Sequence, residues 1–394
     1  MKGKKYIYKI YNEDGVYLTT WKDVSPPSFS YKINSGLSEL IVKLARQFFN
    51  FGEGGDVKIG NELKLYVSDA ETPTSVQIYD GELSKYHLVM GETEEVEVTF
   101  IGYANQLAKR IVVDGSGNTT ISYSTEDPSD VIKDVIDKVG DKVVYTVSSI
   151  DDTGNSVSYD LIQNTALEAI QRMIEVSPVN WYWYVDKTNT LQVHEYNTDN
   201  ITKLYIGKHI NKLEMTKSGE KLVNRYYFLG GGSPQLYKKY EKTTSQTEYG
   251  VKDIREQDER ITIAATAQNR ADNYLTESDH PLMEVTCMVI DSNVDPKNGV
   301  DIENLEPGQS IQIIHPYVAN TTTKWDKATW DLDVWDYDIK TALGQPLRIE
   351  QIDYFGTGAV LHLSKILDTQ AKVIHKNTIQ LETFRGKDAP SAPS

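Results

Sequence analysis

The chain has one cysteine, few histidines and no long apolar run. Because Cys287 is the only cysteine among 394 residues, an intrachain disulfide and a thiolate metal cluster are both excluded. No stretch of about 18 apolar residues is present, so no membrane-spanning helix is predicted. The N-terminal residues 1–15 are basic but lack the apolar segment of a secretion signal. We therefore expect synthesis in a cytoplasm and no membrane anchor.

Signatures of catalysis are missing as well. The sequence contains no G-x-S-x-G, no H-E-x-x-H, no P-loop and no G-x-G-x-x-G that follows a strand. Gly230 to Gly232 do follow a predicted strand, but Ser233-Pro234 does not open a helix, so no phosphate cradle is expected there. The seven histidines are scattered, and no two lie at helical ligand spacing. No catalytic residue, metal or cofactor is predicted, and the chain is not expected to be an enzyme.

The charge is acidic, with 57 Asp and Glu against 41 Lys and Arg and a net charge of -16. This balance argues against DNA binding through a basic footprint and against docking to anionic lipid. No sequence-specific nucleic acid is expected as a partner. Tyrosine is abundant, with 25 residues against 8 phenylalanines. Its large ring with a polar tip suits β-strands and protein interfaces.

Alternating patterns predict β-structure through the first hundred residues. A hairpin is expected over residues 5–21, and further strands are expected at about 28–33, 61–68, 75–80, 84–90 and 94–102. The Asp80-Gly81 pair predicts one tight turn. A helix is predicted from five apolar residues at helical spacing, namely Leu37, Leu40, Ile41, Leu44 and Phe48. These elements predict a first β-barrel or sandwich with one packed helix.

The pattern changes after residue 104. Helices are predicted at 104–110, 131–139 and 165–176, followed by a hairpin over 181–194. These elements define an inserted α/β domain, residues 105–202. The segment Lys203–Gly232 then predicts two strands. We expect it to complete the first barrel, with Leu204 and Ile206 packed against strands from residues 1–103. The first domain would then comprise 1–104 and 203–232.

Residues 233–385 predict a second β-barrel with one helix. The polar stretch 238–260 is expected to be a long exposed hairpin or loop, and an amphipathic helix is expected over 263–275. Strands are predicted at about 282–290, 309–315, 346–354, 358–365 and 371–384. Residues 386–394 predict a flexible tail. The expected fold class is α+β and mainly β, with two barrel-like β domains, a helix packed on each, and the inserted α/β domain.

A loop at about 318–344 carries the most unusual motif, three Trp-Asp pairs at a five-residue period. Its aspartates could bind calcium, although their spacing does not match the D-x-D-x-D-G loop. Its tryptophans could contact a sugar or a protein, or they could pack on the barrel as part of a long hairpin. The candidate interaction loop comprises Trp325, Trp330, Asp331, Asp333, Trp335, Asp336 and Asp338.

Four segments in this order resemble the baseplate hub and tail-associated proteins at the tail tip of bacteriophages, a family shared with contractile injection machines. Residues 96–110 resemble the end of the first barrel of that family, and residues 166–191 resemble its inserted domain. Residues 204–230, with Val223-Asn224-Arg225, resemble its return segment. Leu305–Gly308 before Ile311 resembles a turn in its second barrel.

The resemblance implies a homotrimer in which two barrels per chain form a pseudo-sixfold ring. That ring would fit the sixfold tail tube, close it, and let DNA pass on infection. The implied partners are a distal tail protein or tail tube protein ring and the tape measure protein, with receptor-binding or fibre proteins as further candidates. The implied location is the tail tip of the virion. The alternatives are a carbohydrate- or receptor-binding tail protein that uses the tryptophan-rich loop, and a hydrolase with an unrecognised carboxylate site.

Overall fold

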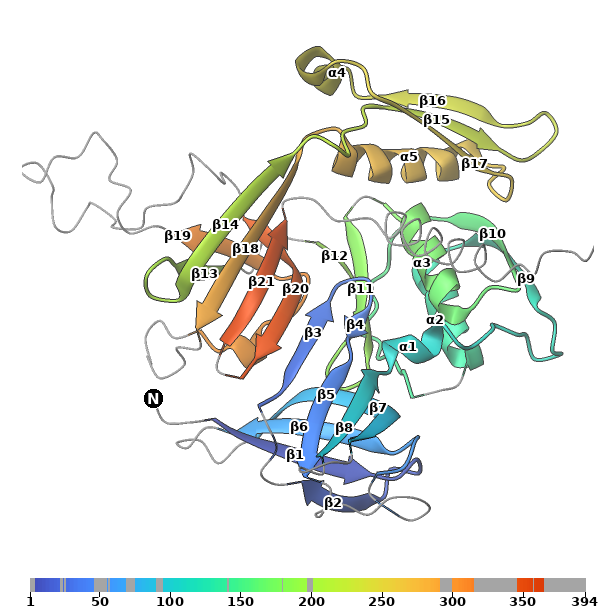
Figure 1. Cartoon of the computed structure of the whole chain (residues 1–394). Helices are drawn as coiled ribbons and strands as arrows, with labels where there is room; N and C mark the ends of the chain where they lie inside the picture. Colours follow the sequence, from blue (N-terminus) through green and yellow to red (C-terminus); the bar gives the residue numbers. More distant parts are fainter. Residues whose placement is uncertain are drawn as a thin grey trace, which may run out of the picture.

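The computed structural model describes residues 4–21, 24, 26–45, 55, 57–68, 75–89, 95–139, 142–178, 180–196, 201–290, 300–314, 346–356 and 358–364. Within these ranges the protein is mainly β, with five α-helices, which confirms the main feature of the predicted fold class. Figure 1 shows two β-sheets, a helical domain beside them, and a small sheet with its own helices at one end of the molecule.

The first sheet is antiparallel, with the strand order β2-β1-β6-β7-β8-β5. Along β1, Tyr8 and Ile10 are buried whereas Lys9 and Tyr11 are half-buried, so one face forms the core. Its strands are β1 (Lys5–Tyr11), β2 (Tyr17–Trp21), β5 (Leu40–Ala45), β6 (Glu62–Ser68), β7 (Val76–Val89) and β8 (Glu95–Gly102).

Two local predictions in this sheet are wrong. The apolar pattern over 37–48 predicted a helix, but residues 40–45 form β5, which pairs with β8. Leu40 and Leu44 are four residues apart, and that spacing places two residues on one face of a helix and also on one face of a strand. The Asp80-Gly81 pair, predicted as a turn, lies inside the continuous strand β7.

The second sheet has the order β13-β19-β20-β21-β18-β14, with β3 and β4 attached beside β20. Its edge strands β13 and β14 are consecutive in the chain and meet at a bridge between Ile206 and Ile210, so the sheet curls toward closure. Its strands are β3 (Ser28–Lys32), β4 (Gly36–Leu37), β13 (Ile201–Tyr205), β14 (Ile210–Ser218), β18 (Leu282–Ile290), β19 (Ser310–Ile314), β20 (Leu347–Phe355) and β21 (Gly358–Ser364).

The two sheets share one apolar core, which extends from Tyr8 in the first sheet to Leu363 in the second. The strands β3 and β4 pair within the second sheet although their neighbours in sequence, β2 and β5, belong to the first. The N-terminal part of the chain therefore contributes to both sheets.

The first part of Lys203–Gly232 forms two strands of the second sheet, and Leu204 and Ile206 pack in the core that both sheets share, so the assignment of this segment to the first domain stays a prediction. The strand β13 runs parallel to β19, where Leu204 lies opposite Ile313, and β14 pairs with β18. Both strands belong to the second sheet, to which β3 and β4 from residues 1–103 also belong. An alternating apolar pattern predicts a strand but does not specify its partner, and this partner follows about 100 residues later in the chain.

The inserted domain packs its helices around a separate apolar core. The predicted helices are confirmed, and α3 begins with a capping box in which Thr165 and Glu168 each satisfy the other's backbone N–H. The antiparallel pair β9–β10, whose strands flank α2 in the chain, and the hairpin β11–β12 complete the domain. Its elements are α1 (Ala104–Leu107), β9 (Thr120–Glu126), α2 (Pro128–Val139), β10 (Val157–Ile162), α3 (Ala166–Val176), β11 (Trp181–Val185) and β12 (Leu191–Glu195).

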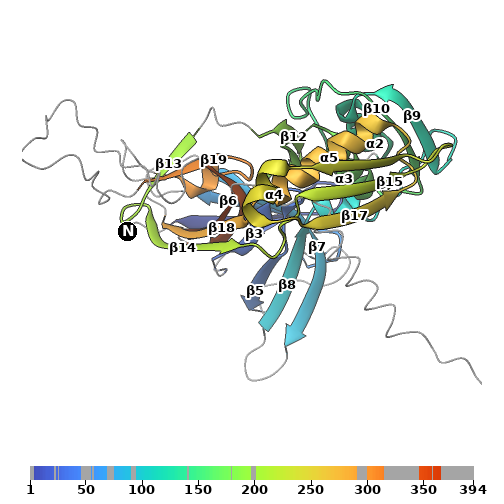
Figure 2. The ribbon, with the colours of Figure 1, turned by 90° about the horizontal axis from the view of Figure 1, so that it is seen from above.

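Residues 219–281 form a small unit, here called the distal module. Its strand order is β16-β15-β17, and α5 packs on one face of these strands (Figures 1 and 2). The stretch 238–260, predicted as an exposed hairpin or loop, instead supplies two strands and a helix. The predicted helix at 263–275 is confirmed. The elements are β15 (Arg225–Gly230), β16 (Tyr237–Glu241), α4 (Thr243–Tyr249), β17 (Asp253–Asp258) and α5 (Ala264–Ser278).

Gly308, just before β19, fixes the contact between the second sheet and the inserted domain. Its φ is +88°, and a Cβ atom placed on it would lie 2.2 Å from a ring carbon of Tyr182 on β11. Its N–H donates to the carbonyl oxygen of Ile349, at 2.8 Å. Only a residue without a side chain fits both the positive φ and the close approach.

We predict that Gly308→Ala destabilises the protein more than Gly207→Ala. Gly207 has a similar φ of +84°, but a Cβ there meets nothing within 4 Å. The control should therefore cost only the positive-φ penalty, about 1–2 kcal/mol. Gly308→Ala should cost about 1–3 kcal/mol more because the ring of Tyr182 must move. Denaturant unfolding of both variants measures the difference, and equal losses would contradict the close packing at Gly308.

Candidate functional site: the joints between the sheets, the inserted domain and the distal module

The predicted interaction loop cannot be placed. All seven of its residues lie outside the described residues, so their role stays a prediction. They are Trp325, Trp330, Asp331, Asp333, Trp335, Asp336 and Asp338.

Groups that could carry chemistry are dispersed over the described part of the chain. There, no three His, Cys, Asp or Glu side chains are grouped to hold a metal ion. His194 contacts Asp151 and His362 contacts Asp353, each at 2.8 Å, as separate pairs. Burial raises the pKa of Cys287 to about 12, so this thiol stays protonated at neutral pH and is a poor nucleophile. No helix in the described ranges is long and apolar enough to cross a membrane.

The side chain of Lys187 forms what we call the central joint. Lys187 lies in the turn between β11 and β12 and is only 7% exposed. Its Nζ donates to the carbonyl oxygens of Glu303 at 2.6 Å and Leu305 at 3.3 Å, at the end of the 3-10 helix η2 (Ile302–Asn304). It also lies 5.4 Å from the ring centroid of Tyr31 and 5.8 Å from that of Tyr354. Carbonyl oxygens and ring faces offset part of the cost of burying its charge.

Three further hydrogen bonds fix the elements around Lys187. The hydroxyl of Tyr354 on β20 donates to the carbonyl oxygen of Ile302, at 3.1 Å. The hydroxyl of Tyr184 on β11 donates to the carboxylate of Glu306, also at 3.1 Å. The side-chain amide of Gln77 on β7 donates to the carbonyl oxygen of Lys187. The inserted hairpin therefore contacts both sheets at one point. Burial lowers the pKa of Lys187, and the nearby carboxylates oppose that shift.

Asp80 is a buried carboxylate next to the central joint. It lies on β7, is 2% exposed, and accepts a hydrogen bond at 3.2 Å from the same Gln77 amide. Burial raises its pKa from 3.8 to about 7, although the charge of Lys64, 3.8 Å away, partly opposes the shift. Asp80 therefore prefers its protonated form in the folded protein far more than in the unfolded chain.

We predict that Asp80 makes the protein lose stability as pH rises from about 4 to 7. Because the folded pKa is raised, the stabilisation is complete below the unfolded pKa and is lost as pH rises through the folded one. The loss should be on the order of 4 kcal/mol, from 1.36 kcal/mol per pKa unit. Asp80→Asn, which resembles the protonated acid, should remove this loss. Unfolding free energies measured from pH 4 to 8 provide the test, with the exposed-site variant Asp160→Asn as the control. Parallel profiles for Asp80→Asn and the unmodified protein would contradict it.

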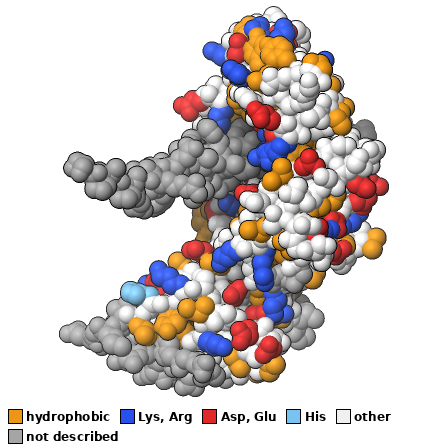
Figure 3. All heavy atoms as spheres, turned by 90° about the vertical axis from the view of Figure 1, so that its right-hand side faces the viewer, with side chains coloured by type: hydrophobic (Ala, Val, Ile, Leu, Met, Phe, Trp, Pro, Cys, Tyr) orange, Lys and Arg blue, Asp and Glu red, His pale blue; other side chains and the backbone are white. Residues whose placement is uncertain are grey.

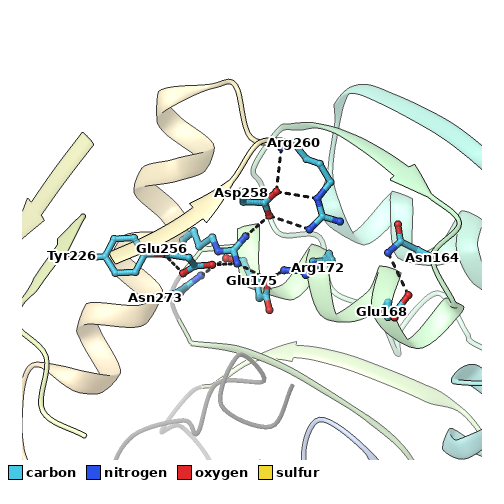
Figure 4. Close-up of polar contacts among 10 residues, drawn as sticks. Asn164, Glu168, Arg172, Glu175, Tyr226, Glu256, Asp258, Arg260 and Asn273 are labelled. Atoms are coloured by element: carbon cyan, nitrogen blue, oxygen red, sulfur yellow. Dashed lines mark hydrogen bonds and ion pairs between the residues drawn. The ribbon is translucent and has the colours of Figure 1, made fainter. Parts of the chain in front are cut away.

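A second joint, here called the distal joint, connects the distal module to the inserted domain (Figure 4). Arg270 on α5 is 8% exposed. Its guanidinium lies 2.9 Å from a carboxylate oxygen of Asp258, pairs with Glu256, and lies 3.6 Å from the carboxylate of Glu175 on α3. Burial alone would raise the pKa of Asp258, but hydrogen bonds from Arg260 and the charge of Arg270 hold that pKa below its ordinary value.

The outer face of the first sheet offers a different kind of surface. Tyr17 is 53% exposed, and lysines lie over two neighbouring rings, Lys9 over Tyr66 at 4.7 Å and Lys64 over Tyr11 at 5.5 Å. Figure 3 shows charges of both signs interspersed on the face that it draws, with hydrophobic groups near the top and near the bottom. Surfaces with exposed tyrosines and mixed charges suit contacts with proteins better than binding that depends on charge of a single sign.

Neither joint was predicted from the sequence. Lys187 was assigned to a hairpin turn, and nothing in its neighbourhood distinguishes it from an exposed turn lysine. Arg270 offers a weak signal, because it lies between Ala267 and Ala271 in the buried stripe of an amphipathic helix. A cation in such a stripe predicts a buried carboxylate partner.

No family model and no curated protein sequence matches the chain. Solved structures do match. The 43 kDa tail protein of prophage MuSo2 from Shewanella oneidensis superposes with a TM-score of 0.60 at 12% identity, over 91% of this chain and 98% of that one. A tail protein from Neisseria meningitidis MC58 also gives 0.60, at 11% identity, over 91% and 96%. Prophage tail protein gp18 from Listeria monocytogenes EGD-e gives 0.59 at 11% identity, over 95% and 99%.

The chain therefore has the fold of tail proteins, two of which come from prophages. The matches cover nearly the full length of both partners, so the two sheets, the inserted domain and the distal module occur together in one known architecture. The resemblance predicted from the sequence is confirmed at the level of the fold.

Proposed function

We propose that this protein is a structural hub of a phage tail tip. In this proposal three copies form a ring, two barrel-like domains per copy produce a pseudo-sixfold surface, and this surface binds the sixfold tail tube. The ring closes the tube and lets DNA pass on infection. The observation that carries the proposal is the full-length match of fold to prophage tail proteins at TM-scores of about 0.60.

The ends of the two sheets support assembly with further copies. An edge strand presents unpaired backbone groups, and a closed ring of subunits covers such edges. Edge strand β5 of the first sheet carries Ile41 at 46% exposure, and edge strand β14 of the second carries Met215 at 52%. Both side chains are apolar and would be buried by a neighbouring subunit.

The proposed partners follow from the position of a hub. A distal tail protein or tail tube protein ring would bind one side, and the tape measure protein would reach the ring from within the tube. Receptor-binding or fibre proteins are further candidates. The alternative of a carbohydrate- or receptor-binding protein depends on the tryptophan-rich loop, so no described residue favours it.

The proposal predicts three copies of the chain in each virion, located at the tail tip. Quantitative mass spectrometry of purified particles, calibrated against a tail tube subunit of known copy number, measures the stoichiometry. Electron microscopy with an antibody against the chain locates it. A count of one or six copies, or a label along the tube or on the capsid, would contradict the proposal.

A further inference from the structure

We propose that the distal module is a hinged unit that docks on the inserted domain through the distal joint and undocks as a whole. The inference concerns a movement within a single chain. It holds or fails whether or not the chain assembles into a trimeric hub.

The first argument is the narrow covalent connection of the module. The chain enters it after Ser218, the last residue of β14, and leaves it before Leu282, the first residue of β18. These two residues are paired in the β14–β18 ladder, so both crossings lie at one point. Gly219 and Pro281 come next to them on the module side, and a Cβ placed on Gly219 would meet nothing within 4 Å. A two-stranded neck of this kind leaves room for rotation of the module.

The second argument is that the module has its own apolar core. One buried apolar cluster lies between β15 and α5, and it consists of Tyr226, Phe228, Ile261, Ala267, Ala271 and Leu275. The core of the inserted domain is a separate cluster drawn from residues 103–193. Because neither cluster extends across the distal joint, undocking does not split an apolar core. The largest cost of separating two packed units is therefore avoided.

The third argument is the polar character of the contacts between α5 and the inserted domain. The side-chain amide of Asn273 donates to the carbonyl oxygens of Ser177 at 2.7 Å and Glu175 at 3.2 Å. The amide of Asn269, one helical turn earlier, donates to the carbonyl oxygen of Val176 at 3.4 Å. These acceptors lie at the end of α3. Water replaces such bonds when the surfaces separate, so each contributes only about 1 kcal/mol to docking.

The fourth argument is that each side of the distal joint stays neutralised when the two separate. Arg270 keeps Glu256 and Asp258, which both belong to the module. Glu175 keeps Arg172, 3.0 Å away on the same helix. Undocking breaks the longer Arg270–Glu175 contact of 3.6 Å and the stacking of Arg260 over the Tyr159 ring at 5.7 Å, and Arg260 keeps its ion pair with Asp258 within the module. Undocking therefore leaves no unpaired buried charge, which would cost 3–5 kcal/mol as an order of magnitude.

The test measures a distance across the distal joint by pulsed electron paramagnetic resonance on the full chain. Spin labels are attached at Val147→Cys in the inserted domain and Tyr237→Cys in the module, two sites that are 95% and 61% exposed. A Cys287→Ala background prevents labelling of the native thiol. The joint variant combines Glu175→Gln, Asn269→Ala and Asn273→Ala. The control is Gln268→Ala, an amide removed from an exposed position on the same helix.

We expect the control to retain the distance distribution of the parent, in which the docked distance dominates. The joint variant should gain a second population at a different distance, with the ratio of undocked to docked molecules raised by on the order of a hundredfold. An unchanged single distance in a folded joint variant would overturn the proposal. If the triple variant does not fold, Asn273→Ala alone should raise the ratio about tenfold, and an unchanged ratio there would overturn it equally.

Discussion

The burial of one ammonium group, that of Lys187, is the constraint around which the rest of the molecule is arranged. An ammonium removed from water must be surrounded by acceptors, and here two carbonyl oxygens and two aromatic rings supply them. The rings are those of Tyr31 on β3 and Tyr354 on β20. The carbonyl oxygens are those of Glu303 and Leu305, in the segment before β19. The hairpin that carries Lys187 can meet all of them in one position only. The inserted domain is thereby held against both sheets.

The two joints differ in what their separation would cost. At the central joint, Lys187 has carbonyl oxygens as its nearest partners, and it would lose every one of them if the hairpin withdrew. The shared core of both sheets lies directly beside it, with Tyr182 and Tyr184 of the hairpin included in that core. At the distal joint, the charges are balanced within each unit and the cores are separate. The central joint therefore favours a rigid body made of the two sheets and the inserted domain. The distal joint favours a distal module that can move relative to that body.

The sequence predicts the elements of this fold better than their arrangement. The helices α2, α3 and α5 follow from apolar residues at helical spacing, together with caps such as Thr165. The strand β5 was predicted as a helix because Leu40 and Leu44 fit both periods. The pairing partners of β13 and β14 could not be read from the sequence, because pairing is decided by packing between distant segments. Lys187 offers no local sign at all, since its partners Tyr31, Glu303, Leu305 and Tyr354 all lie more than 100 residues away in the chain.

The central claim is that Lys187 couples the inserted hairpin to the second sheet. Hydrogen exchange measured by mass spectrometry on Lys187→Ala and on the unmodified protein tests it most directly. The account predicts that protection falls together in β11–β12, in residues 300–314 and in β20, whereas the distal module keeps its protection. A loss confined to the turn at residues 186–190 would contradict the account, because it would show that the sheet holds its position without the buried lysine.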